Sequence, residues 1–152
     1  MGNLAVKGRW LMSDERSEFV AVAITREEAR VWLSTDVPSA EPERFVAPTD
    51  WRRHRHPRKS MDRPEREAEH DTKVFFESVT GAVAESSHIL LVGHGHGKAN
   101  EMLQLVQYWE RRHPEVAHKV VGAVDSNLEA LSDNEILALA HQWYVDNREF
   151  MP

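Results

Sequence analysis

The sequence predicts an α/β domain built on a mixed sheet of five strands. Five short apolar runs have the length and the β-branched content of strands; they lie at residues 19–24, 30–33, 45–47, 89–92 and 119–124. Three longer segments carry apolar residues at helical spacing; they lie at residues 64–85, 98–113 and 133–147. The order is therefore β-β-β-α-β-α-β-α, an antiparallel meander continued by parallel βα units. The most apolar run, 89–92, is expected to be the central strand.

The first three predicted strands follow one another closely. The polar turn from Thr25 to Glu28 is so short that the two strands around it must pair antiparallel. Pro38 and Pro42 bracket a linker to the third strand. Pro48 stops that strand, because proline cannot donate a backbone hydrogen bond.

Each predicted helix has boundary signals of its own. Asp62 is an expected N-cap of the first helix, with Pro64 in its first turn. Lys98 is expected to open the second helix, and Pro114 to end it. The third helix is predicted to begin with a capping box at Ser132–Glu135. The apolar stripes are, in order, Ala68, Phe75, Val79 and Ala82; Met102, Leu103, Val106 and Trp109; and Ile136, Leu137, Ala140, Trp143 and Tyr144.

The composition is that of a globular protein. With 152 residues, 41% hydrophobic and 29% charged, the chain is most simply one domain over residues 17–152, preceded by a lead-in at 1–16. The absence of cysteine excludes disulfides and thiolate metal sites. No apolar run approaches the roughly 20 residues of a membrane span, and the N-terminus lacks the apolar segment of a secretory signal. We therefore expect a cytoplasmic protein without a membrane partner.

A basic segment stands out in an otherwise acidic chain. Residues 51–60 carry five cations and no acid, so the formal net charge of −6 leaves −6 − 5 = −11 for the rest. Arginine forks bind phosphates, and Trp51 could stack on a base. The alternative is a solvated loop that pairs with the acids of the following helix. The candidate nucleic-acid-binding residues are Arg52, Arg53, His54, Arg55, His56, Arg58 and Lys59.

A glycine-rich loop follows the apolar run at 89–92. Backbone N–H groups before a helix can hold an anion, so this loop is a weak candidate anion site. It matches neither the Walker A nor the dinucleotide-binding pattern. The alternative is a tight strand-to-helix turn in which side chains would clash. The residues concerned are Gly93, His94, Gly95, His96, Gly97 and Lys98.

Two His-x-His pairs, at 54 and 56 and at 94 and 96, could each offer two imidazoles to a metal. The first pair sits among five cations, however, and neither pair is accompanied by a carboxylate pattern. The strands at 19–24 and 89–92 lack the acids that a two-metal nuclease requires. We therefore expect no metal, no cofactor and no catalytic residue.

Several segments together resemble a known protein family. They are I-L-L-V-G at 89–93, Lys98 at the start of a helix, H-K-V-V-G-A-V-D at 118–125, and the basic loop with the long helix at 49–85. Over about residues 17–148 the chain resembles the middle domain of the archaeal and eukaryotic peptide-chain release factors and of Pelota. It is similar above all to the small bacterial relatives described as translational machinery components. The resemblance implies a ribonuclease H-like architecture.

The resemblance also implies an RNA- or ribosome-associated module, with ribosomal RNA or tRNA as the partner. In the release factors, a Gly-Gly-Gln tripeptide in the loop before the long helix promotes peptidyl-tRNA hydrolysis. Residues 49–63 contain neither glycine nor glutamine, so the expected module is non-catalytic. Two other hypotheses stay open: a small-molecule or metal-dependent enzyme that uses His94, His96 and Lys98, and a protein-interaction module.

Overall fold

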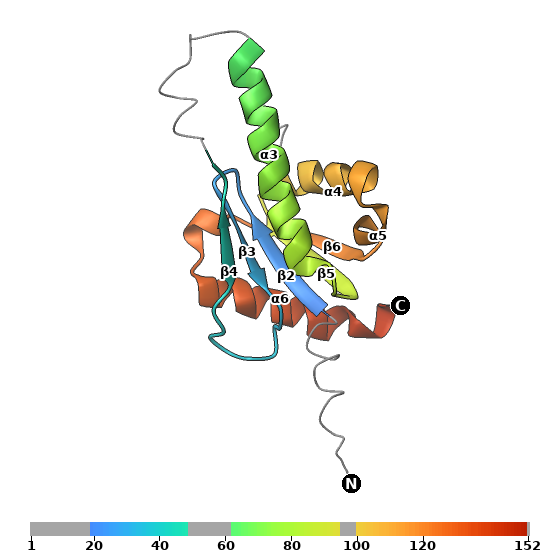
Figure 1. Cartoon of the computed structure of the whole chain (residues 1–152). Coiled ribbons are helices and arrows are strands. Elements are labelled where there is room, and N and C mark those ends of the chain that lie inside the picture. The colour runs from blue at the N-terminus through green and yellow to red at the C-terminus, as the bar shows by residue number, and fades with distance from the viewer. Residues whose placement is uncertain (1–18, 49–61, 95–99, 152) are drawn as a thin grey trace.

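The computed structural model describes residues 19–48, 62–94 and 100–151, with the backbone alone over 62–69. Five strands form one mixed sheet in the order β4-β3-β2-β5-β6, as Figure 1 shows. Their bounds are β2 Phe19–Ile24, β3 Glu28–Trp32, β4 Glu43–Val46, β5 His88–Gly93 and β6 Val120–Asp125. The predicted order of elements and the mixed α/β sheet are confirmed.

The pairing directions follow from the lengths of the connections. β2 pairs antiparallel with β3, and β3 pairs antiparallel with β4, across short links. β2 pairs in parallel with β5, and β5 with β6, because a helix intervenes each time. The predicted central strand is wrong: β2 occupies the centre and β5 lies beside it. Hydrophobicity could not show which of the two strands is central, because β2 and β5 are both buried on both faces.

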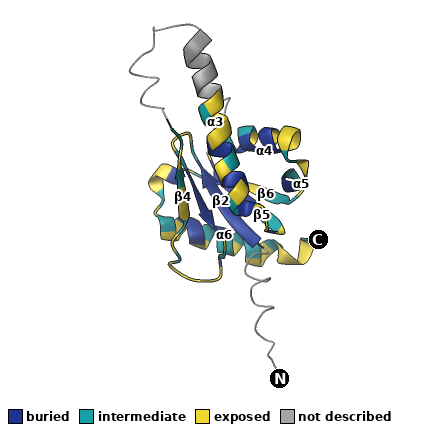
Figure 2. Cartoon of the chain, in the orientation of Figure 1, coloured by how far each residue is buried: buried dark blue, intermediate teal, exposed yellow. Residues whose placement is uncertain are grey.

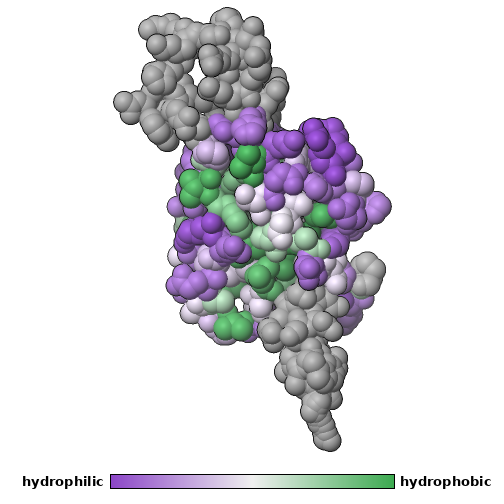
Figure 3. Space-filling view, in the orientation of Figure 1, coloured by the Kyte–Doolittle hydropathy of each residue, from purple (hydrophilic) through white to green (hydrophobic). Residues whose placement is uncertain are grey.

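Helices cover both faces of the sheet. The helices α3 (Asp62–Val83), α4 (Glu101–Arg112) and α5 (Pro114–Ala117) lie on one face, and α6 (Asp133–Asn147) lies on the other. Alternate residues of β2 serve the two cores: Val20, Val22 and Ile24 face α3 and α4, whereas Phe19, Ala21 and Ala23 face α6. Figure 2 shows the buried residues between these layers. In Figure 3 polar residues cover most of the described surface seen there, and apolar ones are concentrated in the middle.

The second helix differs from its prediction at its start and on its buried face. It begins at Glu101, not at Lys98, because the side chain of Asn100 caps it by accepting a hydrogen bond from the Leu103 amide. Leu103 was expected on the apolar face, yet its side chain is exposed. The buried residues of α4 are Met102, Leu105, Tyr108 and Trp109. Pro114 not only follows the end of α4 but also starts α5, where its missing N–H costs nothing.

The third helix matches its prediction closely. α6 begins with the expected capping box: the Ser132 hydroxyl accepts from the Glu135 amide, and the Glu135 carboxylate accepts from the Ser132 amide. Ile136, Leu137 and Ala140 are buried as expected. The short 3₁₀ helices η1 (Leu128–Ala130) and η2 (Arg148–Phe150) flank α6.

The helix α3 is much longer than the strands that it covers. Its 22 residues span roughly 33 Å at 1.5 Å per residue. The six residues of β5 span only about 20 Å. The N-terminal end of α3 therefore extends beyond the sheet, as Figure 1 shows. Phe75 and Val79 anchor the other end in the core, and Asp62 is the first helical residue.

Candidate functional site

The structure describes only part of the predicted site. The basic segment at 51–60, with Arg52, Arg53, His54, Arg55, His56, Arg58 and Lys59, lies outside the described residues. In the chain it stands between β4 and α3. Of the glycine-rich loop, Gly93 and His94 are described, whereas Gly95, His96, Gly97 and Lys98 are not. Both candidate sites therefore stay predictions.

Gly93 ends β5 at a point of close contact. A Cβ at this position would lie 2.9 Å from Cγ of Met102 and 3.0 Å from the carbonyl oxygen of Ile24. The carbonyl of Gly93 also accepts a hydrogen bond of 2.7 Å from the Ser126 amide. Close packing between β2, β5 and α4 thus accounts for a glycine here without any ligand.

A cavity of about 490 Å³ opens at the carboxyl ends of β2 and β5. In open α/β sheets this is the edge at which ligands bind. Its lining residues are Ile24, Thr25, Arg26, Glu27, His94, Glu101, Asn127, Leu128 and Glu129. Three carboxylates against one arginine make the described lining net acidic, which disfavours a free anion.

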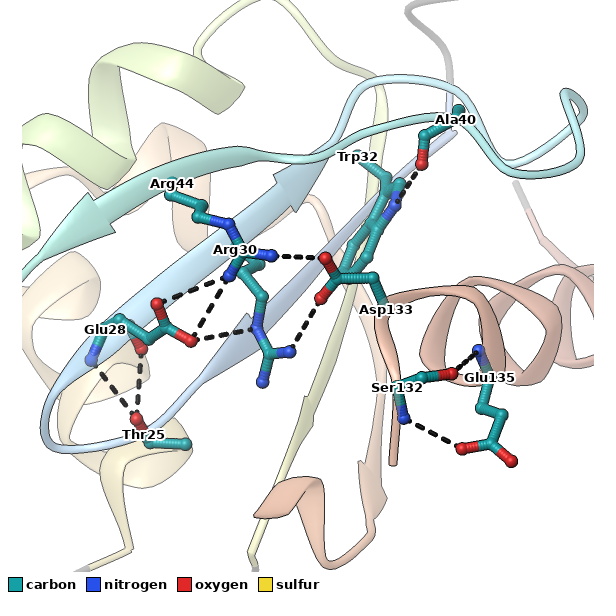
Figure 4. A network of polar contacts seen from close by, with 9 residues as sticks. All are labelled: Thr25, Glu28, Arg30, Trp32, Ala40, Arg44, Ser132, Asp133 and Glu135. Atoms are coloured by element: carbon teal, nitrogen blue, oxygen red, sulfur yellow. Dashed lines mark hydrogen bonds and ion pairs between the residues drawn. The ribbon is translucent and has the colours of Figure 1, made fainter. Parts of the chain in front are cut away.

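A second cavity, of about 360 Å³, adjoins the first and is lined in part by Arg30. Arg30 is only 7% exposed and is held by two carboxylates (Figure 4). Its Nη1 donates to Asp133 Oδ1 at 2.9 Å. Its Nε lies 3.4 Å from Glu28 Oε2 without the alignment of a hydrogen bond. Arg44 of β4 contacts the same two carboxylates, so the cluster ties β3 and β4 to the start of α6.

This four-residue cluster was not predicted from the sequence. Glu28 and Arg30 are two apart on a strand, so their side chains share a face. Asp133, however, lies 103 residues from Arg30 in sequence, and no local pattern connects them. All four charges are compensated within the cluster, so its contacts are those of a structural clamp between edge strand and helix.

Three polar side chains join α3 to the end of α4. The Tyr108 hydroxyl donates to Glu77 Oε2, and His113 Nε2 lies 2.8 Å from the same oxygen. The hydrogen bond from Tyr108, with that of His113 second, lowers the pKa of Glu77. Burial, reinforced by Glu77, raises the pKa of Tyr108 to about 12. A phenol held in its neutral form is a donor, not a nucleophile.

Replacing Tyr108 with phenylalanine should lower the free energy of unfolding by about 1 kcal/mol at neutral pH. The raised pKa has a second consequence: the contribution of Tyr108 is complete below pH 10 and is lost as pH rises from 10.0 to about 12. Urea unfolding at several pH values checks both effects.

The matched control is Tyr144→Phe at the other tyrosine of the chain. We expect this variant to keep the alkaline loss of stability seen in the wild type, and Tyr108→Phe to lack most of it. The same alkaline loss in all three proteins would contradict the assignment to Tyr108.

The described residues contain neither a cluster of metal ligands nor a helix that could cross a membrane. No three histidines, aspartates or glutamates of the described chain form a group that could hold a metal ion. Of the two histidine pairs only His94 is described, and it is exposed. No helix in the described part of the chain is long and apolar enough to cross a membrane.

The strand order places the fold in a known class. Numbered along the sheet, the described strands run third, second, first, fourth, fifth, with the last two parallel to the first. This is the mixed α/β arrangement expected for a translational-machinery-type domain.

No family model matches the sequence, and no curated protein matches it. Among solved structures, the chain is similar to the crystal structure of Pelota from Archaeoglobus fulgidus, with a TM-score of 0.54 and 16% sequence identity. The alignment covers 90% of this chain and 34% of that one. The likeness therefore concerns the fold, and this chain spans about a third of Pelota's length.

Proposed function

We propose that this protein is a non-catalytic RNA- or ribosome-associated module related to translation release and rescue factors. The observation that carries the proposal is the structural similarity to Pelota over 90% of the chain. It agrees with the resemblance found in the sequence segments at 89–93 and 118–125. Fold alone does not define function, so the proposal also needs a surface with suitable chemistry.

The basic segment at 51–60 provides that chemistry. Its five cations stand in a chain whose other residues sum to −11, so no comparable basic run competes with it. A phosphate backbone attracts such a segment whatever its base sequence, and each contact releases counterions. Trp51 and the two histidines add rings that can stack on unpaired bases.

The long helix α3 supports the same interpretation. The basic segment joins α3 at Asp62, and this end of the helix lies beyond the edge of the sheet. A segment attached there can contact a large partner without the body of the domain approaching it. This matters because the body is acidic and would be repelled by RNA.

The non-catalytic part of the proposal rests on the missing glutamine. The three glutamines of the chain are Gln104, Gln107 and Gln142. The first two lie in α4 and the third in α6, so all three are within regular helices. None can take the place of a glutamine in a glycine-flanked loop.

The proposal is tested by titrating structured RNA and purified ribosomes with the full chain at several salt concentrations. We expect binding that weakens with salt, with a log–log slope no steeper than about −3.5 if all five cations contact single-stranded RNA. Changing Arg52, Arg53, Arg55 and Arg58 to serine should abolish the binding. We expect the fold to be unaffected, because the segment is polar and lies between the predicted third strand and the first predicted helix.

A charge-matched control separates local from general electrostatics. Its four substitutions, at exposed Lys73, Arg111, Arg112 and Arg148, also go to serine, and both variants change the net charge from −6 to −10. Only the segment variant should lose binding. If the wild type binds neither RNA nor ribosomes, or if both variants lose binding equally, the proposal is wrong. Binding of other proteins instead of RNA would then favour an interaction module.

A further inference from the structure

The two cavities at the carboxyl end of β2 adjoin and form one groove that the proposed RNA contact does not use. They share four lining residues, Thr25, Glu27, Leu128 and Glu129. The turn after β2 provides the first two, and η1, which follows β6, provides the other two. The volumes of the two cavities, about 360 and 490 Å³, are in the size range of small-ligand sites.

Hydrogen bonds hold both sides of this groove in place. On one side the Thr25 hydroxyl accepts from the amides of Glu27 and Glu28, each at 3.2 Å. On the other side Asn127 Oδ1 accepts from the amide of Glu129, also at 3.2 Å. The backbone around the groove is therefore preorganised, which lowers the entropic cost of binding a ligand there.

A buried arginine reaches one end of the groove. Arg30 lines the smaller cavity, yet its side chain is only 9% exposed. Its Nη1 donates to Asp133, and its Nε is fully buried beside Glu28. The third nitrogen, Nη2, has no partner among the described residues and points away from both carboxylates (Figure 4). Nη2 is therefore the part of the guanidinium left to face the groove, where it can donate to a ligand.

The charges around the groove select a neutral acceptor for Nη2. The four-residue cluster that holds Arg30 contains two arginines and two carboxylates, so it has no positive charge in excess. An anion in the groove would also be repelled by Glu27 and Glu129. A carbonyl oxygen can accept from Nη2 without this repulsion.

The same two glutamates favour a cation beside that carbonyl. Both side chains are exposed, and neither carboxylate forms a hydrogen bond or an ion pair with another described residue. Apolar surface for an aliphatic stem is provided by Leu128 and by Val46, which is 72% exposed. Lysine and arginine side chains combine such a stem with a cationic end.

We infer that the groove binds a peptide segment of another protein that carries a basic side chain. A backbone carbonyl of this segment accepts from Arg30 Nη2, and the cationic end pairs with Glu27 and Glu129. The aliphatic stem packs on Leu128 and Val46. This contact is opposite in charge to the basic segment at 51–60, so its test is independent of the test for RNA binding.

Nuclear magnetic resonance of the ¹⁵N-labelled full chain tests the site with Nα-acetyl-lysine N-methylamide, a lysine flanked by two peptide groups. We expect chemical-shift changes concentrated at residues 25–28 and 127–130. A single residue buries little area, so its dissociation constant should be in the millimolar range. The initial slope of the shift against probe concentration gives relative affinities.

Two analogues measure the contribution of each ligand group. The norleucine analogue keeps both peptide groups but lacks the ammonium, and it should bind about tenfold more weakly. Pentylamine keeps the cation but lacks a carbonyl, and it should bind about fivefold more weakly. This comparison tests Arg30 from the ligand side, because substituting a buried member of the cluster would also destabilise the fold.

A pair of charge-matched variants tests the two glutamates. Glu27→Gln with Glu129→Gln should bind the lysine probe about tenfold more weakly than the wild type. The control, Glu110→Gln with Glu149→Gln at exposed positions outside the groove, should bind like the wild type. Both variants change the net charge from −6 to −4. The inference is overturned if the shifts are absent or spread over the surface, if either analogue binds as tightly as the lysine probe, or if both variants lose affinity equally.

Discussion

Replacing Trp109 with alanine should lower the free energy of unfolding by about 3–5 kcal/mol. Trp109 is fully buried in the core between α3, α4 and the sheet. Its indole Nε1 donates a hydrogen bond of 2.8 Å to the Thr80 hydroxyl. That hydroxyl in turn donates to the Phe76 carbonyl at 2.6 Å. The substitution therefore removes a large apolar side chain and also interrupts a buried series of hydrogen bonds.

Leu103 provides the control for this experiment. It is an apolar residue of the same helix, but it is 50% exposed. Leu103→Ala should change the free energy of unfolding by no more than about 0.5 kcal/mol. Urea unfolding followed by far-ultraviolet circular dichroism measures both variants without relying on tryptophan fluorescence. Equal losses for the two variants would show that α4 does not present Trp109 to the core.

Replacing Gly122 with alanine should destabilise the protein by about 1–3 kcal/mol. A Cβ at this position would lie only 2.6 Å from Cζ2 of Trp143. The indole cannot simply move aside, because it stacks on Phe19 with ring centroids 6.1 Å apart. The added methyl group must therefore push α6 away from β6 or displace the ring from its partner.

The control for Gly122 is another glycine in the opposite situation. Gly81 lies inside α3, and a Cβ there would meet nothing within 4 Å. Gly81→Ala should stabilise the protein by up to about 1 kcal/mol, because alanine has the higher helix propensity. Thermal unfolding of both variants gives shifts of opposite sign if the contacts are as described. A stabilised Gly122→Ala variant would refute the contact with Trp143.

Local signals in the sequence were sufficient for the elements and their order. The run at 19–24 and the capping box at Ser132 lie where they were expected, because strand burial and helix capping depend on nearby residues. The central strand was assigned wrongly, because its position depends on which neighbours pair with it. The predicted start of α4 at Lys98 is wrong because the side chain of Asn100 caps the helix, which begins at Glu101.

The polar clusters could not be predicted, because they join distant parts of the chain. Glu77 meets Tyr108 across 31 residues, and Arg30 meets Asp133 across 103. Within its own segment, none of these four polar residues has a sequence pattern that predicts its partner. The candidate basic segment at 51–60 could be predicted, because it depends on local composition alone. A run of cations without acids can be recognised in the sequence without knowledge of the fold.

The central position of β2 constrains when this domain can fold during its synthesis. β2 leaves the ribosome among the first described residues, yet its parallel neighbour begins only at His88. One face of β2 is covered even later in synthesis, because α6, which packs on it, starts only at Asp133. Until then the described helix that packs on Phe19 and Trp32 is missing, and a nascent chain with exposed apolar strands is prone to associate with chaperones or with other chains. Most of the described chain must therefore emerge before both faces of the sheet are covered.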